Sequence, residues 1–150
     1  MINIPPGKVM SRYEVQEIFQ CSLYSGMNRS LRTNTLVLIT NHTSSLYYDR
    51  WEGEILYFTG MGRSGDQSLQ YLQNRTLYES DRNGVEIHYF EVFSPSQYTY
   101  IGKMKLAGEP FQEYQLDENN KLRKVWVFPL KCITGVPFID LDTIDEKNRV

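Results

Sequence analysis

Short apolar segments, separated by clusters of polar and turn-forming residues, make up most of this chain. Thr35–Thr40 and Glu54–Thr59 are compact and largely apolar, a pattern that is typical of buried strands. Farther along, Val85–Phe93 and Tyr98–Leu106 lie on either side of Ser94-Pro95-Ser96-Gln97, which predicts a β-hairpin. The pattern therefore favours a sheet built from short strands.

A second hairpin is expected near the end of the chain. Its strands are Phe111–Leu116 and Leu122–Leu130, and its turn is Glu118-Asn119-Asn120-Lys121, because asparagine and acidic residues favour turns. Two other stretches, Ser25–Ser30 and Asn41–Arg50, are mostly polar, although the second contains a pair of tyrosines. We expect both to be loops.

Two short helices are also expected. Ser11 and Glu14 match a capping box, in which a serine side chain and a glutamate three residues later satisfy backbone N–H groups. The apolar residues that follow lie on one side of the turns, so this helix spans about Ser11–Gln20. The second helix is predicted over Asp66–Leu77, with Asp66 as its N-cap.

Two helices and about six strands, mostly joined by hairpins, predict an α+β fold that is mainly β. The sheet is expected to be curved and antiparallel, or a partly open barrel. At 150 residues the chain fits one domain with its own core, which we assign to residues 1–131. Residues 132–150, which end in an acidic and polar stretch, are expected to be a tail or a linker to a further domain.

Composition narrows the classes of function. A net charge of −2, with 41% apolar and 23% charged residues, counts against a protein that coats nucleic acid non-specifically but leaves room for a local basic face. Cys21, Cys132, His42 and His88 lack the spacing of a disulfide framework or a metal site, so we expect no metal and no cofactor. Without a signal peptide or an apolar run of about 20 residues, a cytoplasmic protein is expected.

Three ordered motifs are the most specific part of the sequence: an aromatic residue and a threonine before a glycine turn, then an Asp-Gln element, then an Asn-Arg element. They are Phe58-Thr59-Gly60-Met61-Gly62, Asp66-Gln67-Ser68-Leu69 and Asn74-Arg75-Thr76-Leu77. In this order they resemble the SRA (SET- and RING-associated) domain, a family that reads modified cytosine in DNA. The combined spacing is more specific than any one piece.

The resemblance spans about Phe19 to Leu130. Upstream it includes Gly26-Met27, Arg29-Ser30, Leu36-Val37-Leu38 and Tyr47-Tyr48-Asp49. The second half is most similar to the bacterial branch, in which the reader is fused to a nuclease in MspJI-like modification-dependent restriction enzymes. Two features depart from the family: Phe58 replaces the usual tyrosine, and only Arg63-Ser64-Gly65 separate the glycine turn from Asp66, where eukaryotic members carry a longer finger.

The resemblance implies base flipping, because a methyl group can be inspected from all sides only outside the stacked duplex. The family's pocket carboxylate lies nine residues before the aromatic residue of the glycine turn, which corresponds to Asp49. Phe58 would then be one stacking face, Tyr47 or Tyr48 the other, and Thr59 would contact the base through its main chain. Simpler roles stay open: a solvated acid for Asp49, strand-end packing for Phe58, and a core or sheet-edge position for one tyrosine.

Other residues are candidates for contacts with the DNA backbone. The glycine turn is expected to hold phosphate, and Arg63 is the best single candidate. The predicted set is Gly60, Met61, Gly62, Arg63, Arg29, Ser30, Arg75, Lys103 and Lys105. An ordinary solvated surface is the alternative for the cations of this set, and Arg75 is equally consistent with an internal bond between helix and loop.

The sequence contains no Ser-His-Asp order, Walker loop or His-Asn-His arrangement, so we expect a binding module and not an enzyme. Two functions remain. The first is a reader of 5-methylcytosine or 5-hydroxymethylcytosine in duplex DNA, which targets a restriction system whose nuclease lies beyond Val150. The second is a module that binds a protein partner or a free nucleotide, which the acidic net charge favours. The preferred modification, the flanking bases and the oligomeric state stay open.

Overall fold

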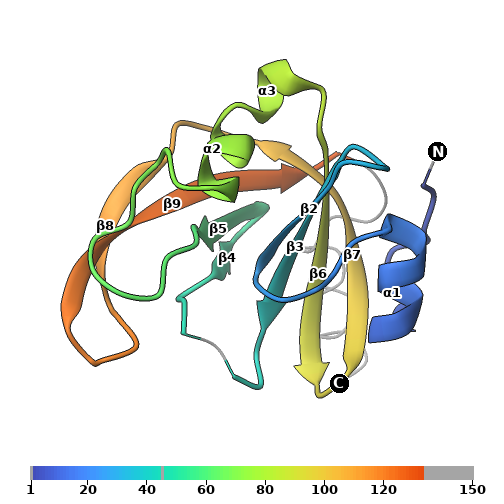
Figure 1. Ribbon diagram of the computed structural model, residues 1–150, viewed down its shortest axis with the longest axis horizontal. Helices are drawn as coiled ribbons and strands as arrows, with labels where there is room; N and C mark the ends of the chain where they lie inside the picture. Colours follow the sequence, from blue (N-terminus) through green and yellow to red (C-terminus); the bar gives the residue numbers. More distant parts are fainter. Residues whose placement is uncertain (1, 45, 134–150) are drawn as a thin grey trace.

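The computed structural model describes residues 2–44 and 46–133 (Figure 1). The helices and strands in these ranges are, in chain order, β1 (Val9–Ser11), α1 (Arg12–Phe19), β2 (Met27–Ser30), β3 (Thr35–Asn41), β4 (Arg50–Glu52), β5 (Ile55–Thr59), α2 (Gln73–Tyr78), α3 (Ser80–Asn83), β6 (Glu86–Ser94), β7 (Gln97–Leu106), β8 (Phe111–Leu116) and β9 (Leu122–Cys132). Apart from positions 132 and 133, the predicted tail or linker lies outside the described residues.

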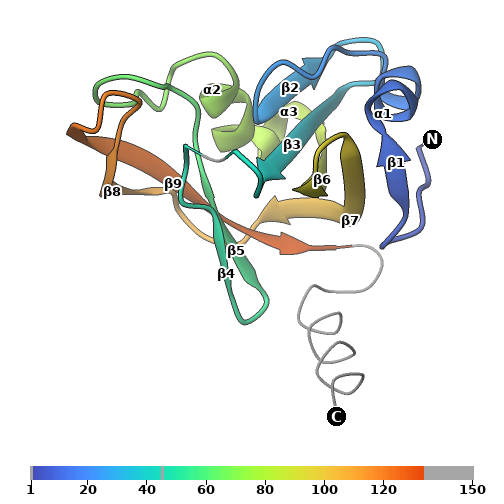
Figure 2. The ribbon, with the colours of Figure 1, turned by 90° about the horizontal axis from the view of Figure 1, so that it is seen from below.

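The strands form one mixed sheet in the order β2-β3-β6-β7-β9-β5-β4, with β1 added to β7 and β8 added to β9. The path is not closed between β2 and β4 within the described ranges, so the sheet is open and not a complete barrel. Figure 2 shows its curvature and the β4–β5 hairpin that projects from it. The prediction of a mainly β, α+β fold with a curved sheet and short helices is confirmed.

One pair of strands differs from the expected antiparallel arrangement. β3 and β6 run parallel, from Thr35 beside Glu86 to Asn41 beside Val92. The chain between them passes through β4, β5 and two helices before it returns, and a long crossover of this kind is what parallel pairing requires. Within the crossover, Asp49 links the two segments that precede the site, because it bonds to Thr40 on β3 and to Thr59 at the end of β5.

The first helix begins as the sequence predicts. The Glu14 N–H donates to Ser11 Oγ at 3.1 Å and the Ser11 N–H donates to Glu14 Oε1 at 2.9 Å, which completes the capping box. The helix buries Val15 and Phe19 against β6 and β7, where Phe90 packs edge-on to Phe19. Among the described residues, no helix is both long and apolar enough to cross a membrane.

The predicted helix over Asp66–Leu77 is wrong in its first half, since α2 begins only at Gln73. Asp66 is not an N-cap: its Oδ1 accepts from the N–H of Lys124 at 2.8 Å, and the Gln67 N–H donates to the Lys124 carbonyl at 2.8 Å. Asp66 and Gln67 therefore bond to β9, and the residues after them form a turn in which the Tyr71 N–H donates to the Ser68 carbonyl at 3.1 Å. A polar segment beside an open strand gains more hydrogen bonds in this way than as an isolated turn of helix.

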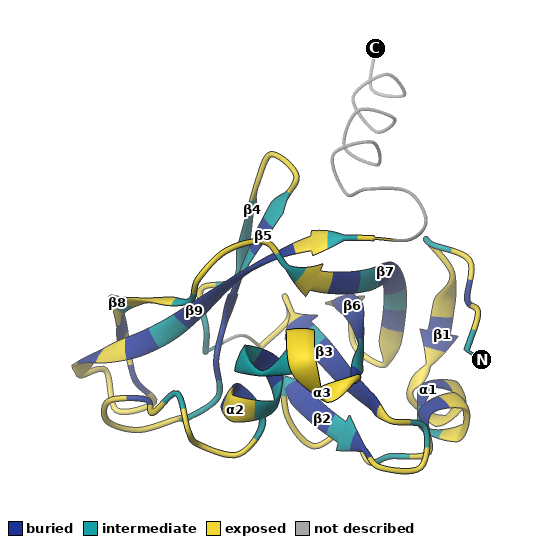
Figure 3. Cartoon of the chain, turned by 90° about the horizontal axis from the view of Figure 1, so that it is seen from above, coloured by how far each residue is buried: buried dark blue, intermediate teal, exposed yellow. Residues whose placement is uncertain are grey.

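Both predicted hairpins are present, as β6–β7 and β8–β9. The prediction of a loop over Ser25–Ser30 is wrong, because β2 pairs with β3 from Met27 beside Leu38 to Ser30 beside Thr35. Its polar residues hid it from the apolar pattern, although Asn28 and Ser30 are buried and most of β2 is coloured as buried in Figure 3. Each is satisfied there by hydrogen bonds, as when Asn28 Oδ1 accepts from the Tyr24 N–H at 3.0 Å.

Candidate base-binding site

Two adjoining cavities open beside the loop that leads from β3 to β4. The first, which we call the aromatic cavity, has a volume of about 230 Å³, and its walls include Tyr47, Phe58 and Tyr71. The second, the polar cavity, has a volume of about 260 Å³, and its walls include Arg12, Asn41, Ser44 and Asp49. The two share a wall that consists of Tyr24, Ser25, Gly26, Ile39, Tyr47 and Arg63.

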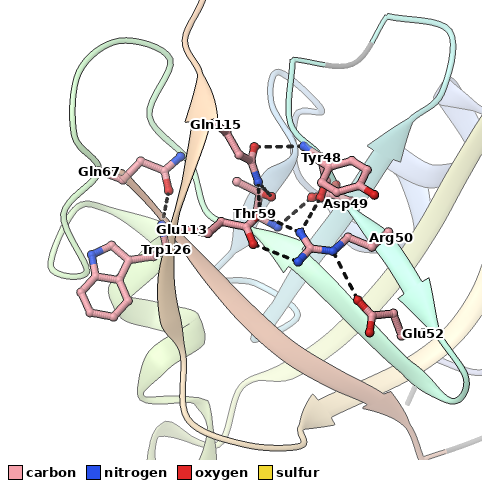
Figure 4. A network of polar contacts seen from close by, with 9 residues as sticks. All are labelled: Tyr48, Asp49, Arg50, Glu52, Thr59, Gln67, Glu113, Gln115 and Trp126. Carbon is pink, nitrogen blue, oxygen red and sulfur yellow. Dashed lines mark hydrogen bonds and ion pairs between the residues drawn. The ribbon is translucent and has the colours of Figure 1, made fainter. Parts of the chain in front are cut away.

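Asp49 lies immediately before β4, and both of its carboxylate oxygens accept hydrogen bonds. Oδ1 accepts from the Thr59 N–H at 2.7 Å (Figure 4) and Oδ2 accepts from Thr40 Oγ1 at 2.7 Å. The buried Tyr89 hydroxyl donates in turn to Thr40 Oγ1 at 2.7 Å. Burial raises the pKa of Asp49 to about 6, although these hydrogen bonds oppose the shift. The result is a fixed carboxylate that is ionised at neutral pH and lines the polar cavity.

A network on the neighbouring strand β8 holds the two residues that flank Asp49. Arg50 donates to both carboxylate oxygens of Glu113, at 2.7 and 2.9 Å, and Gln115 Oε1 accepts from the Tyr48 N–H at 3.1 Å (Figure 4). The arginine holds the pKa of Glu113 below its ordinary value. Bidentate pairs of this kind fix geometry as well as charge, so the backbone on both sides of Asp49 is anchored.

Phe58 packs in the core at the end of its strand and also borders a cavity. Only 2% of it is exposed, and its ring packs edge-on to Tyr89 with a centroid separation of 6.2 Å. It also lines the aromatic cavity. Because Asp49 bonds to the N–H of the next residue, Thr59, the carboxylate and the ring are neighbours. Asp49 lines the polar cavity and Phe58 lines the adjoining aromatic cavity, so open space lies beside each of them.

The two tyrosines that the sequence left as alternatives point to different places. Tyr47 lines both cavities, and burial raises the pKa of its hydroxyl, which a hydrogen bond with the Gly62 backbone opposes. Tyr48 is 63% exposed and lines neither cavity, while the Arg50 guanidinium lies 4.7 Å from its ring centroid. The geometry favours Tyr47 as the second aromatic wall.

The glycine turn is held mainly by the protein itself. The Gly60 N–H donates to the Trp126 carbonyl at 2.8 Å, and the Met61 N–H donates to Asn74 Oδ1 at 2.7 Å. The buried Gln67 side chain donates to the Gly60 carbonyl at 2.6 Å. The N–H groups of Thr59, Gly60 and Met61 are therefore engaged, so the predicted main-chain contacts with base and phosphate cannot use these three donors. The three motifs act chiefly as a scaffold for the cavity wall.

Arg63 is the predicted backbone contact that lies at the site. Its side chain is 66% exposed, lines both cavities, and forms an ion pair with Glu118 at 3.3 Å. Beneath it, the buried Arg123 donates from Nη1 to the carbonyls of Gly62 and Gly65, at 2.9 and 2.8 Å. The turn therefore presents Arg63 from a rigid support.

The other predicted cations line neither cavity. Arg29 bonds within the β2–β3 turn, where it donates to Asn34 Oδ1 at 2.8 Å, and the neighbouring Ser30 is buried. The other three cations of the predicted set lie on α2 and β7. Arg75, on α2, forms an ion pair with Glu79 at 3.2 Å. On β7, Lys103 forms an ion pair with Glu86 at 3.2 Å, and Lys105 lines a different cavity, beside α3.

Sequence reasoning missed several residues of the two cavities. Tyr24, with 87% of its surface exposed, lies at the shared wall, and Tyr71 is 48% exposed beside the glycine turn. Arg12 reaches the polar cavity from the first turn of α1. The signal for Tyr24 was present, since it is a lone aromatic residue in a polar stretch directly before Ser25-Gly26. Arg12 and Tyr71 come from elements whose placement the sequence did not specify.

The comparisons with known proteins define the class. The family model described as "ScoMcrA-like, SRA domain" matches residues 6–139, so the chain belongs to the ScoMcrA-like SRA domain family. This confirms the resemblance to SRA domains on which the sequence interpretation depended. No curated protein matches the chain.

Solved structures share the fold. The structure described as "Sulfur binding domain and SRA domain of ScoMcrA complexed with phosphorothioated DNA" superimposes with a TM-score of 0.72 at 15% identity, over 89% of this chain and 41% of that chain. The SRA domain of SUVH5 in a complex with fully methylated CG DNA gives 0.62 at 21% identity, over 90% and 93%. The MspJI restriction endonuclease in a complex with a 27-mer oligonucleotide gives 0.55 at 11%, over 93% and 37%. The chain thus spans less than half of the ScoMcrA and MspJI chains.

Proposed function

We propose that this chain is a DNA-binding module that recognises a modified cytosine in duplex DNA after the nucleotide has rotated out of the helix. The observation that carries the proposal is the position of the Asp49 carboxylate, fixed by Thr40 and Thr59 beside a cavity walled by Tyr47 and Phe58. The ScoMcrA structure holds phosphorothioated DNA and the SUVH5 structure holds fully methylated CG DNA, so together they support modified DNA as the class of ligand, and the SUVH5 complex alone supports a modification of the base.

The geometry provides the two kinds of contact that an everted pyrimidine needs. Rotation out of the duplex costs a few kcal/mol of stacking and pairing, and each aromatic stacking contact returns roughly 1–3 kcal/mol. Tyr47 and Phe58 supply these faces. The remaining lone pairs of Asp49 accept a hydrogen bond from the exocyclic amine, which is the donor that distinguishes cytosine from thymine. Affinity therefore comes from stacking, and base identity comes from the carboxylate.

Contacts with the DNA backbone are proposed for the exposed rim of the site. Arg63 is the leading candidate, because it is exposed, carries a positive charge and lies at the shared wall of both cavities. Gly62, with a φ of 131°, keeps the turn that presents Arg63 in a conformation that favours glycine.

In the whole protein we propose that this domain targets a modification-dependent restriction system. ScoMcrA and MspJI are restriction endonucleases, and the matching domain makes up 25% of the full ScoMcrA structure and 37% of the MspJI chain. Cleavage would then belong to a nuclease domain outside these 150 residues, in the same chain or in a partner.

Fluorescence anisotropy with matched duplexes tests the proposal. Duplexes that differ at one position, as cytosine, 5-methylcytosine or 5-hydroxymethylcytosine, are compared with one that carries a phosphorothioate linkage and no base modification. Tighter binding of a base-modified duplex supports the proposal, and Asp49→Asn should abolish that preference. Equal affinity for all duplexes, or a preference for the phosphorothioate alone, would refute it. An absence of DNA binding even at low salt would favour a protein or free-nucleotide ligand instead.

A further inference from the structure

The polar cavity is larger than recognition of a methyl group requires. Its volume is about 260 Å³, whereas one water molecule occupies about 30 Å³ in the liquid and a methyl group is of similar size. A methylcytosine in the adjoining aromatic cavity would leave most of the polar cavity to water. Its walls include Arg12, Asn41, Ser44 and Asp49, which are groups that bind a polar occupant.

The position of Asp49 determines which part of a bound cytosine faces this cavity. Asp49 lines the polar cavity, while Phe58 and Thr59 line the aromatic cavity, and the 2.7 Å bond between Asp49 and the Thr59 N–H joins the two walls. In cytosine the exocyclic amine is on C4 and the modification is on C5, so the two groups lie side by side. A base that donates its amine to Asp49 can therefore place its C5 substituent in the polar cavity, with N3 on the other side of the amine.

We propose that the polar cavity receives the C5 substituent of the everted cytosine and selects a neutral, polyhydroxylated group, such as a sugar joined through a hydroxymethyl oxygen. This inference rests on the proposed function, because it concerns the same base in the same site. It adds the chemical class of the modification, which the aromatic cavity alone does not specify.

The donors in the polar cavity match hydroxyl groups. Asn41 Oδ1 accepts from the N–H and the hydroxyl of Thr43, at 2.9 and 2.6 Å, which leaves the amide Nδ2 as a donor. Arg12 uses one nitrogen to donate to the Leu23 carbonyl at 2.7 Å and has further N–H groups. Ser44 adds a hydroxyl that both donates and accepts. A substituent with several hydroxyls can replace water at these groups without losing hydrogen bonds.

The charge at the inner wall argues against an anionic substituent. Arg12 and Arg63 contribute positive charge, but the Asp49 carboxylate lies on the wall that the C5 substituent passes. A negative group beside an ionised carboxylate is disfavoured, whereas a hydroxyl can donate to it. A neutral hydroxylated group therefore satisfies both the donors and the acceptor.

Binding measurements with five duplexes test the inference. They differ at a single cytosine, which is unmodified, 5-methylated, 5-hydroxymethylated, glucosylated on the 5-hydroxymethyl oxygen, or 5-carboxylated. We expect the wild-type chain to bind the glucosylated duplex about tenfold more tightly than the methylated one. If the methylated or carboxylated duplex binds as tightly or more tightly, the inference is overturned while the proposed function stands. If all five bind equally, the proposed function fails as well.

Variants of residues that line the polar cavity test whether this cavity determines the preference for the glucosylated duplex. Asn41 is the exposed last residue of β3 and Ser44 is exposed in the loop that follows, and Asn41→Leu and Ser44→Ala should each reduce the ratio of the glucosylated to the methylated affinity several-fold. Asn3→Leu, an exposed asparagine that lines neither cavity, is the matched control and should keep the wild-type ratio. If Asn41→Leu and Ser44→Ala weaken all five duplexes by the same factor, these residues contact the DNA backbone and the inference is overturned.

Discussion

At the scale of single residues, the site depends on the protonation of one carboxyl group. Asp49 has a pKa of about 6, raised by burial. In the proposed complex the ionised carboxylate accepts from the cytosine amine, so affinity for the modified duplex should fall as the pH drops below about 6. Asp49→Asn should remove both the preference and this pH dependence. Anisotropy titrations between pH 5 and 8 measure this pH dependence. A wild-type preference for the modified duplex that does not change with pH would contradict the prediction.

The stability contributed by the same group should change in the opposite direction. Its pKa in the folded protein lies above the ordinary value of 3.8, so the folded state binds the proton more tightly than the unfolded state. The Asp49 contribution to the free energy of unfolding therefore increases as the pH falls from about 6 toward 4 and is lost as the pH rises again. Urea unfolding of the wild type and of Asp49→Asn across this pH range measures this contribution, as the difference between the two free energies of unfolding. Weaker binding at pH 5 would then not be explained by loss of this group's stability.

The Thr40 hydroxyl is expected to set the orientation of Asp49. Thr40→Val removes the donor to Asp49 Oδ2 and leaves the Tyr89 hydroxyl without its acceptor, which should cost about 1–3 kcal/mol of stability and raise the pKa of Asp49 further. Tyr89→Phe is the control, because it keeps the Thr40–Asp49 bond. The midpoint of the pH dependence of binding should rise in Thr40→Val but stay nearly unchanged in Tyr89→Phe.

At the scale of the elements, the glycine turn is a packed structure. A Cβ on Gly60 would lie 2.6 Å from Asn74 Oδ1 and 3.2 Å from the Phe128 ring. Gly60→Ala should therefore destabilise the fold by about 1–3 kcal/mol and disturb the aromatic cavity. Gly108→Ala, whose Cβ would meet only Pro129 at 3.8 Å, is the control and should be nearly neutral. Thermal unfolding of both variants checks this, and equal melting temperatures would contradict it.

The elements also show which parts of the site the sequence could predict. The capping box and both hairpins follow from local patterns, because their signals lie within a few residues of one another. The segment 66–72 was predicted incorrectly because its partner is distant: Asp66 and Gln67 bond to Lys124 on β9, and no local pattern records such a contact. Strand β2 was missed for a different reason: its partner β3 is adjacent in the chain, but its buried polar residues have the pattern of a loop.

The loop that carries Tyr47 shows most clearly which part of the site the sequence could not predict. One buried residue on β6, Glu91, accepts from Trp51 Nε1 at 2.9 Å and bonds to His42 Nε2 at 2.5 Å, so it holds both ends of the segment between β3 and β4. Nothing in the sequence near Tyr47 indicates this anchor. The resemblance to SRA domains located Asp49 and Phe58 by spacing, whereas the choice of Tyr47 over Tyr48 required coordinates.

At the scale of the whole molecule, an acidic protein is proposed to bind a polyanion through a local basic rim. The net charge is −2, so attraction must come from residues such as Arg63 at the cavities and not from the average charge. Each phosphate contact contributes about one unit to the slope of log affinity against log salt concentration. Arg63→Gln should therefore reduce this slope by about one and weaken modified and unmodified duplexes alike.

A matched arginine separates this local contact from the effect of total charge. Arg82 on α3 is 74% exposed and lines neither the aromatic nor the polar cavity, and Arg82→Gln changes the net charge by the same amount as Arg63→Gln. If the local rim governs binding, Arg82→Gln keeps the wild-type salt slope and Arg63→Gln does not. Equal slopes in the two variants would mean that DNA is attracted by the overall charge or through another face, and the placement of the duplex across the two cavities would be wrong.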